Sequence, residues 1–189
     1  MGKSGKKKDF CRRMNPRLYF PLTLLAFVLA GAASGQQGWP QRHSISAAAH
    51  LPVGTFSSTH VAGAGADYTW SHSKELLPGA VGFAAGGGMD YFLGKKEKAA
   101  GYDYRNGNYF SLYGLAGAVY RPGINYHLSV MAGPSLGIYK GSASAGGAFR
   151  FASAYRWNEQ WAIGPAVFLR QHINTKALWT VSLRASRFL

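Results

Sequence analysis

The feature that most constrains this chain is a succession of eight segments, each about ten residues long, in which apolar residues alternate with small or polar ones. Alternation with a period of two indicates β-strands that have two different faces, because successive side chains of a strand point to opposite sides. About ten residues are also enough for a tilted strand to cross a lipid bilayer. The eight predicted strands span residues 43–53, 60–70, 80–93, 109–120, 126–139, 147–157, 160–171 and 178–189.

The composition of the two faces indicates which one is buried. In the last predicted strand, Trp179, Val181 and Leu183 share one face, whereas Thr180 and Arg184 lie on the other. Across the eight strands the second face is mostly Gly, Ser, Ala and Thr with a few charges, which is too small and too polar for the core of a soluble protein. We therefore expect an all-β fold, an eight-stranded antiparallel up-and-down transmembrane β-barrel whose apolar face meets lipid. The alternative architecture is a soluble lipocalin-like barrel with the two faces exchanged.

The first 35 residues form the pattern of a secretory signal peptide. Residues 1–20 carry seven Lys and Arg against Asp9 alone, residues 18–33 are an apolar run, and Ser34 and Gly35 supply a small-residue cleavage site. This order of a basic region, an apolar region and small residues is typical of a cleaved signal. The alternative is an uncleaved helical anchor. We predict a signal peptide over 1–35, a short segment over 36–41 and the barrel over 42–189, and hence an exported, multi-pass protein of the outer membrane.

Removal of the signal changes the charge and the thiol content of the chain. The full sequence has 21 Lys and Arg and 7 Asp and Glu, and seven of these basic residues and one acidic residue lie in the first 35, so a net charge of about +8 remains of the total +14. The remaining charges are scattered rather than clustered, and we expect no nucleic-acid partner. The single cysteine, Cys11, leaves with the signal, so the exported part has no disulfide framework.

Aromatic residues on the apolar face gather near the strand ends. Two such belts are expected where amphipathic rings lie at both interfaces of a membrane. One predicted belt lies on the side of the short turns and the other on the side of the longer loops. The first contains Trp70, Tyr120, Tyr126, Trp157 and Trp161, and the second contains Tyr91, Phe110, Phe149 and Trp179.

Charged residues on the opposite face predict ion pairs inside the barrel, because an eight-stranded barrel is just wide enough for its own side chains to fill and an unpaired buried charge is costly. Strand direction places Asp67 toward the end that contains both termini, with Arg156 or Arg184 as its partner. It places Asp90 toward the other end, with Arg150 or Arg170. The alternative role for these groups is a proton or ion pathway. The candidate residues are Asp67, Asp90, Arg150, Arg156, Arg170 and Arg184.

The histidines do not predict a catalytic or metal site. His127 and Ser129 share a strand face, a pair that also occurs in lipid-modifying outer-membrane enzymes, but no carboxylate is near in sequence to orient the imidazole. The six histidines are dispersed without metal-ligand spacing. We expect no catalytic, cofactor-binding or metal-binding residue and no enzymatic activity.

The signal peptide, the eight amphipathic strands and the terminal Arg187-Phe188-Leu189 together resemble the small outer-membrane β-barrel proteins of the OmpA/OmpX type and the related outer membrane protein beta-barrel domain group. The resemblance covers residues 42–189. It implies a monomer with both termini in the periplasm and outer loops near 54–60, 94–108, 140–146 and 172–177. It further implies contact with outer-membrane lipid and with the membrane assembly machinery. Lys95, Lys96 and Lys98 could also contact lipopolysaccharide.

The role that this resemblance implies is structural or one of surface interaction, with a lumen plugged by side chains. Two alternatives remain open. A narrow porin-like conduit for small or hydrophobic solutes requires an open lumen, and an outer-membrane lipid-modifying enzyme requires a His, Ser and carboxylate cluster at the outer leaflet.

Overall fold

A computed structural model of the protein describes residues 41–72, 79–99, 102–173 and 175–189. The predicted signal peptide over 1–35 and the segment that follows it to residue 40 lie outside the described residues, as do residues 73–78 between the predicted strands over 60–70 and 80–93. Within the described residues, no helix is both long enough and apolar enough to span a membrane.

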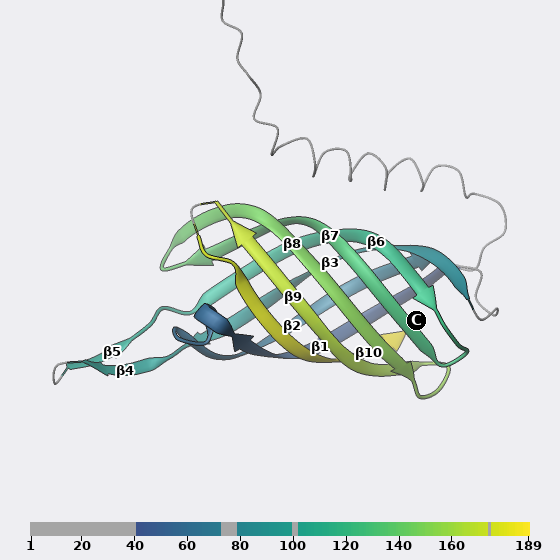
Figure 1. The fold of residues 1–189 in the computed structure, drawn as a ribbon, viewed down its shortest axis with the longest axis horizontal. Helices are drawn as coiled ribbons and strands as arrows, with labels where there is room; N and C mark the ends of the chain where they lie inside the picture. The colour runs from purple at the N-terminus through teal and green to yellow at the C-terminus, as the bar shows by residue number, and fades with distance from the viewer. Residues whose placement is uncertain (1–40, 73–78, 100–101, 174) are drawn as a thin grey trace, which may run out of the picture. The chain divides into compact units, whose positions relative to one another are not determined.

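Eight long strands close into one antiparallel barrel in the order β1-β10-β9-β8-β7-β6-β3-β2 (Figure 1). The predicted eight-stranded up-and-down barrel is therefore confirmed. The last strand closes it against the first, with a register that runs from Ser44 opposite Phe188 to Val53 opposite Trp179. The strands are β1 (Gln41–Val53), β2 (His60–His72), β3 (Ala80–Gly94), β6 (Tyr109–Arg121), β7 (Tyr126–Tyr139), β8 (Ser142–Arg156), β9 (Trp161–His172) and β10 (Leu178–Phe188).

The two ends of the barrel differ. At the terminal end, where β1 begins and β10 ends, residues 122–125 and 157–160 make short connections. At the hairpin end, a 3₁₀ turn η2 (Gly54–Phe56) follows β1, and a separate two-stranded hairpin of β4 (Lys96–Ala99) and β5 (Tyr102–Arg105) follows β3. Figure 1 shows this hairpin projecting beyond the barrel wall. It occupies the segment predicted as the polar loop 94–108.

The predicted outer loop over 140–146 is wrong. The strands β7 and β8 remain paired up to Tyr139 opposite Ser142, so only Lys140 and Gly141 connect them. Both residues have positive φ, 49° and 79°, which is the backbone that a two-residue hairpin turn requires. The Gly, Ser and Ala residues after the turn have low strand propensity, but pairing with β7 overrides that preference.

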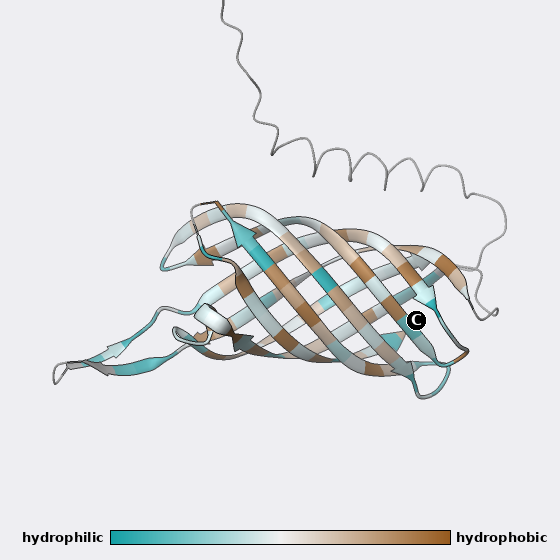
Figure 2. Cartoon of the chain, in the orientation of Figure 1, coloured by the Kyte–Doolittle hydropathy of each residue, from teal (hydrophilic) through white to brown (hydrophobic). Residues whose placement is uncertain are grey.

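Side-chain exposure alternates along the strands, with the apolar residues outside. On β9, Trp161 and Ile163 are 44% and 43% exposed, whereas Ala162, Ala166 and Phe168 are 3%, 2% and 1% exposed. Figure 2 shows hydrophobic residues along the barrel wall and a hydrophilic β4–β5 hairpin. The barrel thus carries its large aliphatic residues on its outer surface, the reverse of a soluble protein.

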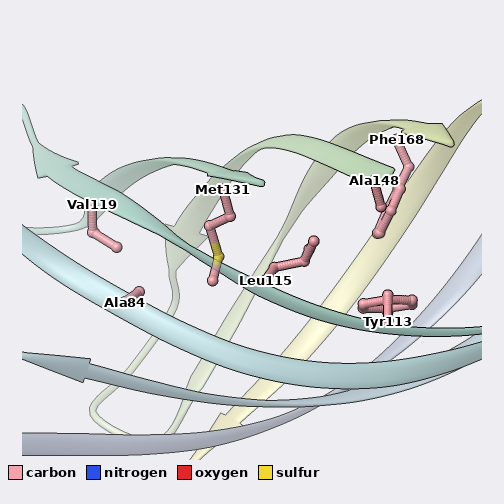
Figure 3. Close-up of a cluster of buried hydrophobic side chains, with 7 residues drawn as sticks. All are labelled: Ala84, Tyr113, Leu115, Val119, Met131, Ala148 and Phe168. Carbon is pink, nitrogen blue, oxygen red and sulfur yellow. The ribbon is translucent and has the colours of Figure 1, made fainter. Parts of the chain in front are cut away.

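Two apolar clusters nevertheless lie inside the barrel. One, the middle apolar cluster, lies in the lumen along strands β3, β6, β7, β8 and β9, and it contains Ala84, Tyr113, Leu115, Val119, Met131, Ala148 and Phe168 (Figure 3). The other lies at the hairpin end and contains Phe56, Phe92 and Tyr109, with Tyr139 and Leu178 packed against it. The strand β6 supplies residues to both clusters, which explains why the sequence shows apolar groups on both of its faces.

Candidate functional site

The lumen contains two groups of charged side chains, one toward each end of the barrel. Their two carboxylates and three guanidiniums come from inward-facing positions on five strands, and four of these five charged residues are less than 10% exposed. Glycines on β2 and β3 leave the space that these side chains occupy. A Cβ at Gly65 would lie 1.9 Å from Asp90 Oδ1 and 2.8 Å from His50 Nε2, and one at Gly88 would lie 2.5 Å from Asp67 Cβ.

The hairpin-side group joins Asp90, Arg170 and His50. Arg170 Nη2 donates to Asp90 Oδ2, and Arg170 Nη1 donates to Thr180 Oγ1 at 3.3 Å. His50 Nε2 lies 3.0 Å from the other Asp90 oxygen, Oδ1. The Arg170 guanidinium carbon also lies 3.9 Å from the centroid of the Phe168 ring, an arrangement that favours a cation–π interaction. One carboxylate and one guanidinium thus balance within a buried, aromatic-walled space.

The terminal-side group centres on Asp67. Arg184 Nη2 donates to both Asp67 oxygens, at 2.6 and 2.7 Å, and to Ser46 Oγ at 3.1 Å. Arg150 Nη1 lies 3.4 Å from Asp67 Oδ1, and Arg150 Nη2 lies 3.0 Å from the Met131 sulfur. Two guanidiniums therefore share a single carboxylate here, and the group as a whole keeps a positive charge.

The structure separates the six predicted ion-pair candidates. Arg184 forms an ion pair with Asp67, and Arg170 forms one with Asp90. Arg150 contacts Asp67 and not Asp90, so of the two alternatives predicted for Asp90 the structure has Arg170 beside it. Arg156 is also not a partner of Asp67: its guanidinium donates to the backbone oxygens of Asn158 at 3.2 Å and Glu159 at 3.4 Å, at the terminal end. It closes the β8–β9 turn because it is the last residue of its strand.

Sequence reasoning missed two contributors to the lumen. His50 lies on the inward phase of β1, and that phase was the only signal that it could meet Asp90. Phe56 belongs to the turn η2, outside every predicted strand, yet it is 2% exposed and packs edge-on to Phe92, with ring centroids 5.0 Å apart. No periodic pattern covers a turn, so the sequence contained no signal that Phe56 folds back over the lumen.

A cavity of about 70 Å³ lies in the terminal half of the lumen, and Ala84, Val119 and Met131 of the middle apolar cluster form part of its wall. A cavity of this size is large enough to hold water. Its polar wall includes Arg121, His127 and Arg184 together with the hydroxyls of Ser44, Ser46, Thr69, Ser71, Ser129 and Ser186. His127 and Ser129, the pair considered for catalysis, thus lie in the terminal half of the barrel and not near the hairpin end.

Most of the aromatic residues predicted to form two belts lie at outward-facing positions near the strand ends. Phe149 does not, because β8 begins at Ser142 and Phe149 is therefore midway along it, and Trp157 follows the end of β8. Most are substantially exposed, from 41% for Phe149 to 78% for Trp157. Arg187 also faces outward, and its guanidinium carbon lies 5.9 Å from the centroid of the Trp161 ring near the terminal end. A cation in this position pairs with an aromatic side chain at the edge of the apolar surface.

The β4–β5 hairpin contacts the neighbouring β7–β8 turn. Lys140 Nζ donates to the Tyr104 hydroxyl at 2.7 Å and lies 5.3 Å from the centroid of the Tyr104 ring. This hydrogen bond raises the pKa of Lys140, so the side chain stays charged at neutral pH. Basic residues Lys95, Lys96, Arg105 and Lys140 therefore lie at this end, together with the acidic residues Glu97 and Asp103.

Among the described residues, no group of three or more His, Cys, Asp or Glu side chains could hold a metal ion. No family model matches the chain, and no curated protein matches its sequence.

Solved structures do resemble this barrel. The crystal structure of Ail, the attachment invasion locus protein of Yersinia pestis, in complex with the heparin analogue sucrose octasulfate is 12% identical, with a TM-score of 0.55, and the match covers 81% of this chain and all of that chain. The backbone structure of the outer membrane protein Ail in a phospholipid bilayer nanodisc is 14% identical, with a TM-score of 0.52, and covers 79% of this chain and all of that chain. At this identity the likeness concerns the fold, and the chain has the fold of the small eight-stranded outer-membrane β-barrels.

Proposed function

We propose that this protein is an integral outer-membrane β-barrel with a structural or surface-interaction role. The single observation that carries the proposal is the reversed distribution of its residues. Large apolar side chains such as Ile45, Leu51 and Leu183 are 52%, 63% and 57% exposed on the barrel wall, whereas Asp90 and Arg170 are 1% and 0% exposed inside it. A continuous apolar wall around a polar interior suits lipid outside and is costly in water.

The dimensions of the strands support a membrane location. The shortest barrel strand has 11 residues and the longest have 15. At about 3.3 Å per residue and a tilt of about 40°, 11 residues reach about 28 Å along the barrel axis, which covers an apolar band of about 25 Å. The aromatic residues near both strand ends then lie at the two membrane interfaces, as predicted for the belts.

The side chains inside the barrel support a closed lumen over a conduit. Phe92, Phe168 and Arg170 are all at most 1% exposed, and the seven buried side chains of the middle apolar cluster lie inside the barrel (Figure 3). A hydrated path for solutes would have to pass both this cluster and the Phe56 cover. The stability of the barrel, and not transport, is the role that these contacts favour.

The hairpin end supports the surface-interaction role. With a cleaved signal over 1–35 and both barrel termini in the periplasm, the β4–β5 hairpin lies outside the cell. Its cations, together with Lys140, favour contact with anionic groups such as lipopolysaccharide phosphates. The structure of Ail contains a sulfated heparin analogue, which makes sulfated or phosphorylated polysaccharides the first ligands to examine. We propose a non-enzymatic monomer that the outer-membrane assembly machinery inserts.

Membrane fractionation of cells that express the full chain tests this proposal. We expect recovery in the outer-membrane fraction, and a faster electrophoretic mobility of unboiled samples than of boiled ones, because a closed barrel resists detergent unfolding until it is heated. N-terminal sequencing of the recovered protein reports where the signal is cleaved. Recovery in the soluble periplasm, with one mobility before and after boiling, would refute a membrane barrel.

A further inference from the structure

A row of exposed side chains crosses four neighbouring strands on the outer wall near the terminal end. Ile45 on β1 lies opposite Tyr68 on β2 and opposite Arg187 on β10. On the far side of β10, Arg187 lies opposite Trp161 on β9. All four side chains, which we call the outer row, are exposed. Since they face away from the lumen, they lie where the proposed function places lipid.

Polar and charged groups concentrate in the outer row. The Arg187 guanidinium carbon lies 5.9 Å from the centroid of the Trp161 ring, and an aromatic ring attracts a cation without neutralising it. On the other side of Ile45, the Tyr68 hydroxyl forms a hydrogen bond with His43 Nδ1. Guanidinium, indole and phenol groups all donate hydrogen bonds, and a guanidinium binds a phosphate group in paired, charge-assisted bonds. The outer row thus offers donors and a permanent positive charge at the edge of an apolar surface.

Small side chains follow the outer row toward the middle of the barrel wall. The next outward positions of β1, β2 and β10 hold five exposed alanines that lie opposite one another across the strands. These residues, which we call the alanine patch, are Ala47, Ala49, Ala64, Ala66 and Ala185. Larger side chains border the patch on both sides, namely Met89 and Tyr91 of β3, Ile163 of β9 and Leu183 of β10. At about 3.3 Å per residue, the patch extends from about 7 to about 13 Å beyond the outer row along the strands.

The order of these features along the wall matches the order of the parts of a phospholipid, in which the acyl chains run from a phosphate at the interface into the apolar core. Trp161 is the first residue of β9 and Arg187 is the penultimate residue of β10, so the outer row lies at the strand ends. A charge on the lipid-facing wall is least costly there, near the interface, and the alanine patch lies deeper. The positive charge of Arg187 favours a lipid with a net negative charge, because the ammonium group of a zwitterionic lipid offsets its own phosphate.

We propose that the outer wall at the terminal end binds one anionic phospholipid, with its phosphate on the Arg187 guanidinium and its acyl chains on the alanine patch. Trp161 and Tyr68 lie on either side of the headgroup as further donors. This inference rests on the proposed function, because it requires the wall to face lipid. Recovery of the protein in the soluble periplasm would overturn both. A barrel that is recovered in the outer membrane but shows no preference for anionic lipid would overturn this inference alone.

Native mass spectrometry of the full barrel, released from a non-ionic detergent, tests the site because it counts the lipid molecules that stay bound. The two probes are phosphatidylglycerol and phosphatidylcholine with the same acyl chains. We expect one phosphatidylglycerol per barrel, bound about tenfold more tightly than phosphatidylcholine. Arg187→Gln should remove this difference, because its charge-assisted bonds to the phosphate are lost. The matched control is Lys140→Gln, which removes a cation at the opposite end and should leave the preference for phosphatidylglycerol unchanged.

A second pair of variants tests the acyl-chain contact without changing the charge. Ala47→Leu places a larger side chain within the alanine patch and should weaken phosphatidylglycerol binding about threefold, since the acyl chains lose part of their contact with the wall. Its control is Ala118→Leu, because Ala118 is also exposed on the outer wall near the terminal end of β6 and lies outside the patch. The inference is overturned if the wild type binds both lipids equally, or if Arg187→Gln and Ala47→Leu both bind phosphatidylglycerol as tightly as their controls do.

Discussion

The two halves of the lumen both contain buried charges, but they differ in how these charges are paired and packed. In the hairpin half, Asp90 and Arg170 are balanced, at most 1% exposed, and walled by Phe92 and Phe168. In the terminal half, Asp67 is shared by two arginines, further arginines lie at the mouth, and a cavity remains. The balanced pair is densely packed, whereas the shared carboxylate lies in the half that contains the cavity. We infer that the first half contributes more to the stability of the barrel than the second.

The largest expected effect comes from unbalancing the hairpin half. Asp90→Ala leaves the Arg170 charge buried and unpaired, and we expect a loss of about 3–5 kcal/mol in the free energy of unfolding. Urea unfolding of the barrel refolded into lipid vesicles, followed by tryptophan fluorescence, measures this. The double variant Asp90→Ala with Arg170→Met should recover part of the loss. Strictly additive losses would show that the two side chains do not form an energetic pair.

The corresponding substitution in the terminal half, Asp67→Ala, should lower the free energy of unfolding by less than Asp90→Ala does. Asp67→Ala removes the carboxylate that Arg150 and Arg184 share, but the Arg184 side chain is 13% exposed and both arginines face a cavity that can admit water. We expect a loss of about 2–3 kcal/mol, measured in the same urea series. A loss equal to or larger than that of Asp90→Ala would contradict the difference between the two halves.

A third substitution, Gly65→Ala, tests how tightly side chains pack against the glycine backbone in the hairpin half. Gly65→Ala places a methyl group 1.9 Å from Asp90 Oδ1, so the Asp90–Arg170–His50 group must shift, and we expect a loss of about 1–3 kcal/mol. Gly114→Ala is the matched control, because its Cβ would meet no atom within 4 Å. Equal stabilities of the two variants would mean that this half is not tightly packed.

The smallest expected effect lies outside the lumen. Lys140→Gln removes the contact with Tyr104 but no buried group, so the urea midpoint should not change, whereas trypsin should cleave the β4–β5 hairpin faster. Because the pKa of Lys140 is raised by this hydrogen bond, the contact is fully present below the ordinary lysine pKa and is lost as pH rises through the raised value. The wild-type cleavage rate per active protease should therefore not change between pH 7 and pH 9. An unstable barrel in this variant would contradict a peripheral role.

The sequence was sufficient for the barrel because an alternation of apolar with small or polar residues is clear along the strands other than β6, which has apolar residues on both faces. It also assigned Asp67, Asp90 and the inward arginines to the lumen. It could not assign the partner of Arg150, because Arg150 on β8 and Asp67 on β2 face each other across the barrel, and their relative height depends on the stagger of the closed sheet. Alternation specifies the face of a residue but not its opposite neighbour.

The remaining errors have a similar origin. The segment after Gly141 is rich in small residues that resemble a loop, and only its long-range pairing with β7 makes it a strand. Phe56 follows no period at all, and its burial depends on the way η2 turns into the barrel. Local composition cannot report contacts that arise only when the sheet closes.

The alternation of lipid contact along one strand tests the central claim most directly. The only cysteine of the chain, Cys11, lies in the predicted signal, so single cysteines placed through β9 can each carry a nitroxide spin label in vesicles. We predict that collision with oxygen, which concentrates in lipid, is high at positions 163, 167 and 169 and low at 162, 166 and 168. Uniform accessibility, or high collision with a water-soluble reagent at positions 163 and 167, would contradict a barrel whose apolar wall faces lipid.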